Sequence, residues 1–318
     1  MNNPTNTIDT SFNKYVKERS SKNSLHIEGG IPDYAFASDY ALRQKLNTIP
    51  GVYSFFKAVY NHVVPKERQL LYLSSLKVGP SQCPDIYEIA KDCAKILGIG
   101  MPTVFIQHKV QEINAYAVAY EDSEPLIILT SALVERCSIE ELKAVIGHEC
   151  GHIHNNHGIY DNAARVLISY AAGGISLPQQ LIGLFTTSIH WALMAWSRAA
   201  EVTCDRAGII CCGEEESTSS FHKKVMSGAM LGHSDFNTEE ILKQYDKFRD
   251  TPVRFLELNS THPTSVRRMF AAKEFMNSEV YYKWHPEQKK PGMALLSKQE
   301  LDARCDKYIS VLKSDKRS

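Results

Sequence analysis

The sequence has no excess of charge of either sign, since its 318 residues carry 36 Lys and Arg against 36 Asp and Glu. No dense run of basic residues occurs before the C-terminal Lys313, Lys316 and Arg317. These absences argue against nucleic acid or an anionic membrane surface as the main partner. The hydrophobic fraction of 43% and the charged fraction of 23% are ordinary for globular proteins, which excludes wholesale disorder.

Cysteine is scarce too, and none of the eight cysteines belongs to a Cys-x-x-Cys pair. This pattern argues against zinc ribbons and a disulfide scaffold, and it favours buried free thiols in a reducing compartment. The polar residues 1–24 lack the apolar core of a signal peptide. We therefore expect a cytoplasmic protein.

Acidic and basic residues are absent from Val166 to Ser197, a stretch long enough to span a bilayer. Gly173-Gly174, Pro178 and several Gln, Thr and Ser residues interrupt it, so no apolar run of about 20 residues remains. We predict two buried helices joined near Pro178. Peripheral or integral association of 166–197 with a membrane is the alternative.

Helical patterns dominate the rest of the chain, with one short β region. Residues 1–35 are expected to form a flexible polar arm. Residues 102–108 predict a strand, and residues 114–120 and 125–130 predict a hairpin. Residues 70–78 fit strand or helix equally. Apolar spacing predicts helices at 40–46, 51–62, 84–97, 160–172, 179–212, 217–231, 237–249, 264–283 and 297–312.

The most informative string is His148-Glu149-Cys150-Gly151-His152, in a predicted helix that starts with a capping box at Ser138. Two histidines four residues apart on a helix point within about 40° of each other, so both imidazoles can reach one metal ion. Zinc favours imidazole, and Glu149 beside the pair can take the proton of a water that attacks a carbonyl. The apolar residues 142–147 predict a buried helix, whereas the alternative is a pair of surface histidines.

Two further histidines follow in the same segment. His154 and His157 point about 140° and 160° away from the predicted metal direction, so neither can bind the same ion. The metzincin pattern also fails, because its third histidine would fall at position 158, which is Gly. Cys150 is expected to be a core thiol, and Gly151 to leave room for a neighbouring helix or for substrate.

A third metal ligand must come from another element, and Glu201 is the best candidate. Glu201 and Asp205 are four residues apart on one predicted helix. One carboxylate can therefore bind the metal while the other orients a ligating histidine. Most such pairs are merely solvated, but the flanking Ala199-Ala200 and Ala207–Ile210 predict burial here.

Four motifs follow one another in the chain: Asn114-Ala115-Tyr116-Ala117, the helix with His148 and His152, the segment Arg198–Gly208, and Thr261-His262-Pro263 with Arg268. In this order the chain resembles the HtpX-type and CaaX-prenyl-protease family of zinc metallopeptidases, peptidase family forty-eight, which are gluzincins. The resemblance covers residues 50–285 and is closest to the soluble bacterial branch.

The resemblance implies a mostly α-helical α+β fold, in which a small β-sheet with an edge strand for substrate packs on the histidine-bearing helix. It implies a catalytic domain over 50–285, and composition and patterning add an N-terminal arm and helix (1–49) and a charged C-terminal tail with a helix (286–318). For the site the resemblance implies one Zn²⁺ per chain, held by His148, His152 and Glu201, with Glu149 as general base and Asp205 as the partner of a ligand. It places His262 and Arg268 near the substrate or transition state. It also implies a substrate strand with Asn114, Ala115, Tyr116 and Ala117. Independently of the resemblance, His262-Pro263 could simply cap the next helix.

We hypothesise a zinc-dependent metalloendopeptidase that hydrolyses extended or unfolded polypeptides. The peptide partner would add as a strand to the edge near Ala115–Tyr120. A membrane-associated protease of the same family and a zinc-holding scaffold that binds peptides without turnover are the alternatives. Glu149 favours catalysis, since a pure binder has no need of it. The sequence carries no signal for oligomeric state.

Overall fold

The computed structural model describes residues 26–120, 123–174, 176–178, 187–228, 236–247 and 251–311. Its strands are β1 (Ile27–Glu28), β2 (Ile31–Pro32), β3 (Leu76–Lys77), β4 (Thr103–Gln107), β5 (Ala115–Tyr120) and β6 (Ser123–Thr130). Its α-helices are α2 (Ala37–Thr48), α3 (Val52–Ser74), α4 (Pro84–Leu97), α5 (Ser131–Arg136), α6 (Ile139–His154), α7 (Gly158–Ala171), α9 (Thr187–Cys212), α10 (Glu216–Ser227), α11 (Thr238–Asp246), α12 (Ser265–Met276), α13 (Glu279–Trp284) and α14 (Lys298–Ile309). Two 3-10 helices are η1 (Pro252–Asn259) and η2 (Pro286–Gln288). The expected α+β class is confirmed.

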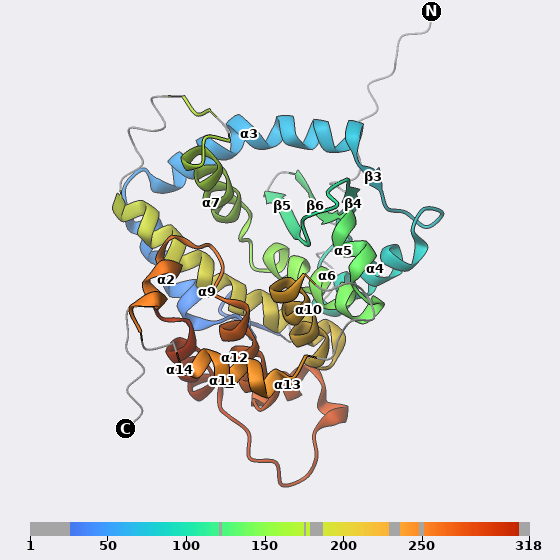
Figure 1. Ribbon diagram of the computed structural model, residues 1–318, viewed down its shortest axis with the longest axis vertical. Coiled ribbons are helices and arrows are strands. Elements are labelled where there is room, and N and C mark those ends of the chain that lie inside the picture. The colour runs from blue at the N-terminus through green and yellow to red at the C-terminus, as the bar shows by residue number, and fades with distance from the viewer. Residues whose placement is uncertain are drawn as a thin grey trace, which may run out of the picture.

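Helices α6 and α9 occupy the middle of the molecule, with α3 and the sheet on one side and α11 to α14 on the other (Figure 1). Glycines let the two central helices approach closely. A Cβ on Gly208 would lie 2.6 Å from the carbonyl oxygen of Ala144, and one on Gly151 would lie 2.7 Å from the Cβ of Ala207. The predicted role of Gly151 as room for a neighbouring helix is therefore confirmed.

The larger sheet has the strand order β3-β4-β6-β5, in which β4 and β6 are parallel and β5 and β6 antiparallel. Its two faces are both covered. One packs on α3 through residues such as Phe105 and Ile128, and the other joins the core around α4 and α6 through Ile127 and Leu129. Strand β5 lies at the edge, beside α6 and α7.

Local signals predicted several element boundaries. Helix α4 ends at Gly98, whose φ of 68° closes the helix in the left-handed region. Helix α6 begins with the capping box of Ser138 and Glu141. The undecided segment 70–78 is the end of α3 followed by β3. The single helix predicted over 264–283 is wrong, because Ser278 interrupts it and its side chain caps α13.

The uncharged stretch 166–197 contains the end of α7 and the start of α9. Pro178 lies between these helices as predicted, and residues 175 and 179–186 fall outside the described part of the chain. None of the described helices combines the length and the apolar character that crossing a membrane requires.

The ends of the described chain pack on the central helices. Tyr34 and Phe36 are fully buried, and the backbone N–H of Phe36 donates to Thr203 Oγ1 of α9. At the other end, Asp302 of α14 lies 2.8 Å from the buried Arg206 of α9. The prediction of a flexible arm up to residue 35 is therefore wrong for its last residues, because they belong to the core.

Candidate metal centre

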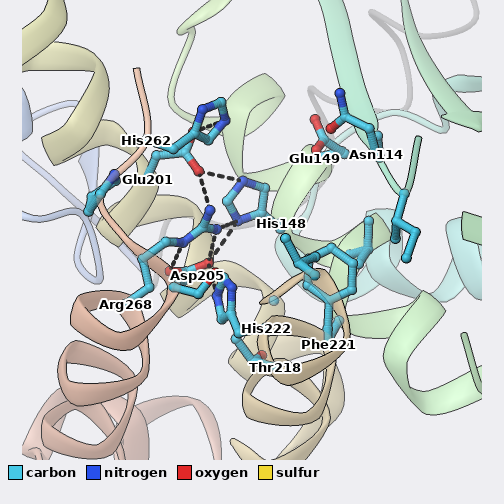
Figure 2. A pocket seen from close by; sticks show the side chains of 18 of the residues that line it. Asn114, His148, Glu149, Glu201, Asp205, Thr218, Phe221, His222, His262 and Arg268 are labelled. Atoms are coloured by element: carbon cyan, nitrogen blue, oxygen red, sulfur yellow. Dashed lines mark hydrogen bonds and ion pairs between the residues drawn. The ribbon is translucent and has the colours of Figure 1, made fainter. Parts of the chain in front are cut away.

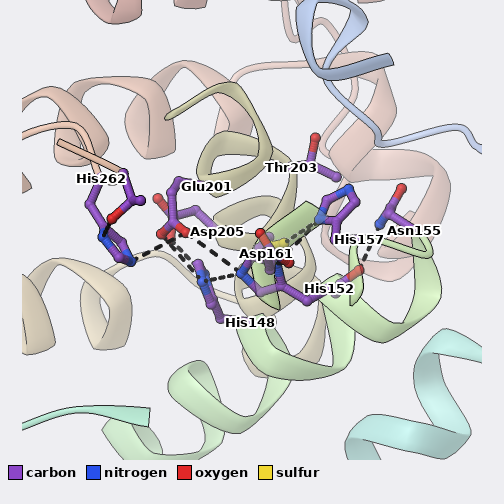
Figure 3. A network of polar contacts seen from close by, with 12 residues as sticks. His148, His152, Asn155, His157, Asp161, Glu201, Thr203, Asp205 and His262 are labelled. Carbon is purple, nitrogen blue, oxygen red and sulfur yellow. Dashed lines mark hydrogen bonds and ion pairs between the residues drawn. The ribbon is translucent and has the colours of Figure 1, made fainter. Parts of the chain in front are cut away.

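Helices α6 and α9 bring the three predicted metal ligands together. His148 Nε2 and His152 Nε2 are 3.2 Å apart, as their spacing on one face of α6 requires. From α9, Glu201 places Oε2 3.5 Å from His148 Nε2 and Oε1 3.6 Å from His152 Nε2. Figure 3 shows the three side chains turned toward one another.

The outward nitrogen of each histidine faces a carboxylate. His148 Nδ1 lies 3.0 Å from Asp205 Oδ1, and His152 Nδ1 lies 2.8 Å from Asp161 Oδ2. A proton on each Nδ1 would be donated to the facing carboxylate and would leave the Nε2 lone pair free for a metal ion. The two Nε2 atoms and the Glu201 carboxylate converge, an arrangement suited to a cation.

The spacing of the donors fits zinc. Zinc bonds of about 2.0–2.1 Å in a tetrahedron place neighbouring donor atoms about 3.4 Å apart. The observed distances among His148, His152 and Glu201 run from 3.2 to 3.6 Å. Cys204 Sγ also lies within 4.8 Å of donor atoms of both histidines. Burial raises the pKa of the Cys204 thiol, so a metal ion bound there would have to displace its proton.

Arg268 of α12 forms ion pairs with both Glu201 and Asp205 of α9. Its Nη1 lies 2.8 Å from Glu201 Oε2, and its Nε donates to Asp205 Oδ2 at 2.8 Å. Burial alone would raise the pKa of Asp205, but the guanidinium holds it below its ordinary value. Arg268 lines the cleft, and its Nη2 also lies 3.3 Å from His148 Nδ1.

His262 reaches the same group from the segment before α12. Its Nε2 lies 3.5 Å from Glu201 Oε1, and its side chain is 59% exposed. Glu149, next to His148, is buried, and this burial raises the pKa of its carboxyl despite the two nearby histidines. Both side chains line the cleft around the metal-binding atoms.

Sequence reasoning missed the contacts behind His152. Asp161, which faces its Nδ1, lies on α7, beyond a turn in which Asn156 has a φ of 55°. His157 Nδ1 lies 3.2 Å from the same nitrogen, and Asp39 Oδ2 accepts from His157 Nε2 at 3.0 Å. The turn ends the helical periodicity, and Asp39 is distant in sequence, so no local pattern indicates either carboxylate.

The cleft has two compartments that meet at His148, Glu149 and Glu201. The first has a volume of about 360 Å³ and is bounded by α10 and the start of α12. The second, of about 580 Å³, is bounded by α7 and the residues around Tyr116 and Ala117. Figure 2 shows the first compartment, with the residues of α10 below the carboxylate–arginine group.

The predicted substrate strand borders both compartments. Asn114 precedes β5, and its backbone exchanges hydrogen bonds with Thr130 of β6. Ala115, Tyr116 and Ala117 pair with β6 on one side, and β5 has no strand on its other side within the described sheet. Farther along, Gly158 of α7 packs on the Ala119 carbonyl, where a Cβ would lie 1.9 Å from the oxygen. The open edge is therefore confined to the start of β5.

Comparison with known proteins agrees with this geometry. Residues 80–276 match the model of Peptidase family M48. The chain is 28% identical over 247 residues to the plastoglobule-localized metallopeptidase 48, chloroplastic, of Arabidopsis thaliana, which covers 74% of this chain and 70% of the relative. It is 24% identical over 230 residues to a protease HtpX homolog of Bifidobacterium longum, covering 64% of this chain and 74% of that protein. The matched segment contains both central helices, and the chain belongs to peptidase family M48 as an HtpX-like metallopeptidase.

Proposed function

We propose that this protein is a zinc-dependent endopeptidase that cleaves extended or unfolded polypeptides. The observation that carries the proposal is the convergence of two imidazole Nε2 atoms and the Glu201 carboxylate at 3.2–3.6 Å, beside the buried Glu149. This donor set matches the two-histidine, one-carboxylate sites of catalytic zinc.

His148, His152 and Glu201 are the proposed zinc ligands, with Asp205 and Asp161 orienting the two histidines. When bound, zinc supplies Lewis-acid polarisation of the scissile carbonyl and makes a water nucleophilic at neutral pH. Arg268 keeps Glu201 and Asp205 ionised, because its guanidinium lies against both carboxylates.

Glu149 is the proposed general base. It accepts the proton of the attacking water and later delivers that proton to the leaving amine. The raised pKa of its buried carboxyl supports this role, since a raised pKa makes the carboxylate a stronger base. His262, exposed in the cleft near Glu201, is proposed to donate a hydrogen bond to the oxyanion.

The substrate is proposed to pair with the edge of β5 at Ala115–Ala117, where main-chain hydrogen bonds would hold it as an added strand. Such pairing needs an extended backbone, which favours unfolded segments over folded proteins. Because compartments lie on both sides of the metal-binding atoms, the chain of the substrate can continue in both directions. This supports an endopeptidase.

Glu149→Gln is the test of the proposal. We expect one zinc per chain in the wild type and in the variant, with casein cleavage reduced about 10²–10⁴-fold in the variant. Glu135→Gln, which changes an exposed glutamate of α5, is the matched control and should cleave normally. Wild-type protein that lacks zinc after metal add-back would overturn the proposal. Zinc without cleavage in any of the three proteins would favour a peptide-binding scaffold.

A further inference from the structure

Two buried side-chain atoms on the floor of the first compartment have no hydrogen-bond partner in the described part of the chain. Thr218 and His222 are four residues apart on α10, so they share one face of the helix. They are 5% and 2% exposed. Thr218 Oγ1 and His222 Nε2 have no hydrogen-bond partner among the described residues. Figure 2 shows both at the base of the compartment, near Phe221.

The neighbouring groups of the protein do not satisfy these atoms. Asp205 Oδ1 lies 4.0 Å from His222 Nε2, beyond hydrogen-bonding distance, and already accepts from Arg268 and faces His148. A buried polar group without a partner is rare in folded proteins and costs stability. Two such groups on one wall of a cleft point to a partner that enters the cleft.

The other walls restrict the chemistry of that partner. The lining of the compartment includes five larger apolar side chains, those of Ile113, Val145, Phe221, Val225 and Pro263. A stem that packs against them is apolar. The charges at its base, Asp205 and Arg268, neutralise each other at 2.8 Å. Burial and the nearby Arg268 also lower the pKa of His222 to about 3, so its imidazole is neutral at neutral pH. Asp205, whose Oδ1 lies 4.0 Å from His222 Nε2, is thus already paired and does not require a charged side chain of the partner.

We propose that the first compartment is a specificity pocket for a substrate residue next to the scissile bond, one with an apolar stem and a neutral hydroxyl or amide tip. Tyr and Gln are the side chains that fit this description. Thr218 Oγ1 and His222 Nε2 recognise the tip by hydrogen bonds, and Phe221 and Val225 pack on the stem. The proposal rests on the proposed endopeptidase function and names its substrate class.

Peptides that differ by a single polar tip test the pocket. One series compares Tyr with Phe and the other compares Gln with Met. In each series the residue stands either just before or just after the scissile bond, and mass spectrometry of the products identifies the cleaved bond. At one of the two flanking positions, we expect kcat/KM of the Tyr peptide to exceed that of the Phe peptide by about 10-fold or more. The same ratio is expected for the Gln peptide over the Met peptide. A site built to bond a polar tip rejects the analogue without it, because its own buried groups stay unpaired.

Thr218→Val removes the hydroxyl at almost constant shape and should reduce both ratios toward one, while cleavage of the Phe peptide is retained. His222→Phe should act in the same direction. Thr48→Val, at an exposed position of α2, is the control and should leave the ratios unchanged. If His222→Phe does not fold, Thr218→Val decides alone.

If the Tyr and Phe peptides, and likewise the Gln and Met peptides, are cleaved at equal rates, the proposed specificity pocket is wrong. The proposed endopeptidase function is then unaffected. Unchanged ratios in Thr218→Val and in folded His222→Phe would also overturn it. Absence of cleavage of every peptide by zinc-loaded wild type would overturn the proposed function, and the pocket with it.

Discussion

Asp39 of α2 offers the most quantitative test of how the metal centre is supported. Its carboxylate is 2% exposed and accepts from three buried donors. These are Trp196 Nε1 at 2.9 Å, Thr203 Oγ1 at 2.7 Å and His157 Nε2 at 3.0 Å. His157 in turn contacts His152. Asp39→Asn replaces one acceptor oxygen by an amide donor, so at least one of the three donors loses its partner.

The magnitude follows from the pKa of Asp39. Burial alone would raise this pKa, but His157, Arg43 and Thr203 lower it from 3.8 to about 2. Each pH unit of such a difference corresponds to about 1.36 kcal/mol, so the ionised carboxylate adds about 2–3 kcal/mol to the free energy of unfolding at neutral pH. Since the pKa is lower in the folded state, this contribution is present above pH about 4 and disappears as the pH falls to about 2.

Urea denaturation at pH 7 should therefore show that Asp39→Asn lowers the free energy of unfolding by about 2–4 kcal/mol. The stability difference between wild type and variant should shrink as the pH falls from 4 to 2. Asp92→Asn, at an exposed site on α4, should stay within about 0.5 kcal/mol of wild type. A variant at position 39 that is as stable as the wild type would refute the reasoning.

Three further perturbations address the packing and charge around the centre. Gly208→Ala places a Cβ 2.6 Å from the Ala144 carbonyl oxygen and should lower the free energy of unfolding by about 1–3 kcal/mol in thermal denaturation. Gly79→Ala, where a Cβ meets nothing within 4 Å, is the control and should leave stability unchanged. Equal losses of stability in both variants would contradict the close helix contact. Asp161→Asn should weaken zinc binding about 10–100-fold in chelator competition, and an unchanged affinity would exclude its contact with His152 as a support of the ligand. Arg268→Gln should lower the free energy of unfolding by about 3–5 kcal/mol in urea, because it leaves two buried carboxylates without their cation; a loss below about 1 kcal/mol would argue against this ion-pair group.

Sequence reasoning succeeded where the relevant contacts are local. Helical spacing alone brings His148 and His152 to one face of α6, and Glu201 and Asp205 to one face of α9. The ends of α4 and the start of α6 also follow from nearby residues, Gly98 and the Ser138 capping box. Helical spacing does not predict that these two faces contact each other in the folded protein. The order of the four motifs and the family resemblance did predict this contact.

The contacts that escaped prediction link residues far apart in sequence. Asp39 reaches His157 from a helix outside the matched segment, and Asp161 follows a turn that resets the helical phase. Thr218 and His222 lie in a polar stretch that resembles an exposed helix face, and packing of α10 against α6, α9 and α12 buries them. Periodicity describes one element at a time, so it has no means to identify these partners.

The X-ray absorption spectrum at the zinc edge tests the central claim most directly. If His148, His152 and Glu201 hold the ion, zinc-loaded wild type should show only nitrogen and oxygen neighbours at about 2.0–2.2 Å, with the outer-shell scattering of two imidazoles. A sulfur neighbour at about 2.3 Å would identify Cys204 as a ligand and contradict the assignment of Glu201. A spectrum without imidazole scattering would contradict the metal centre itself.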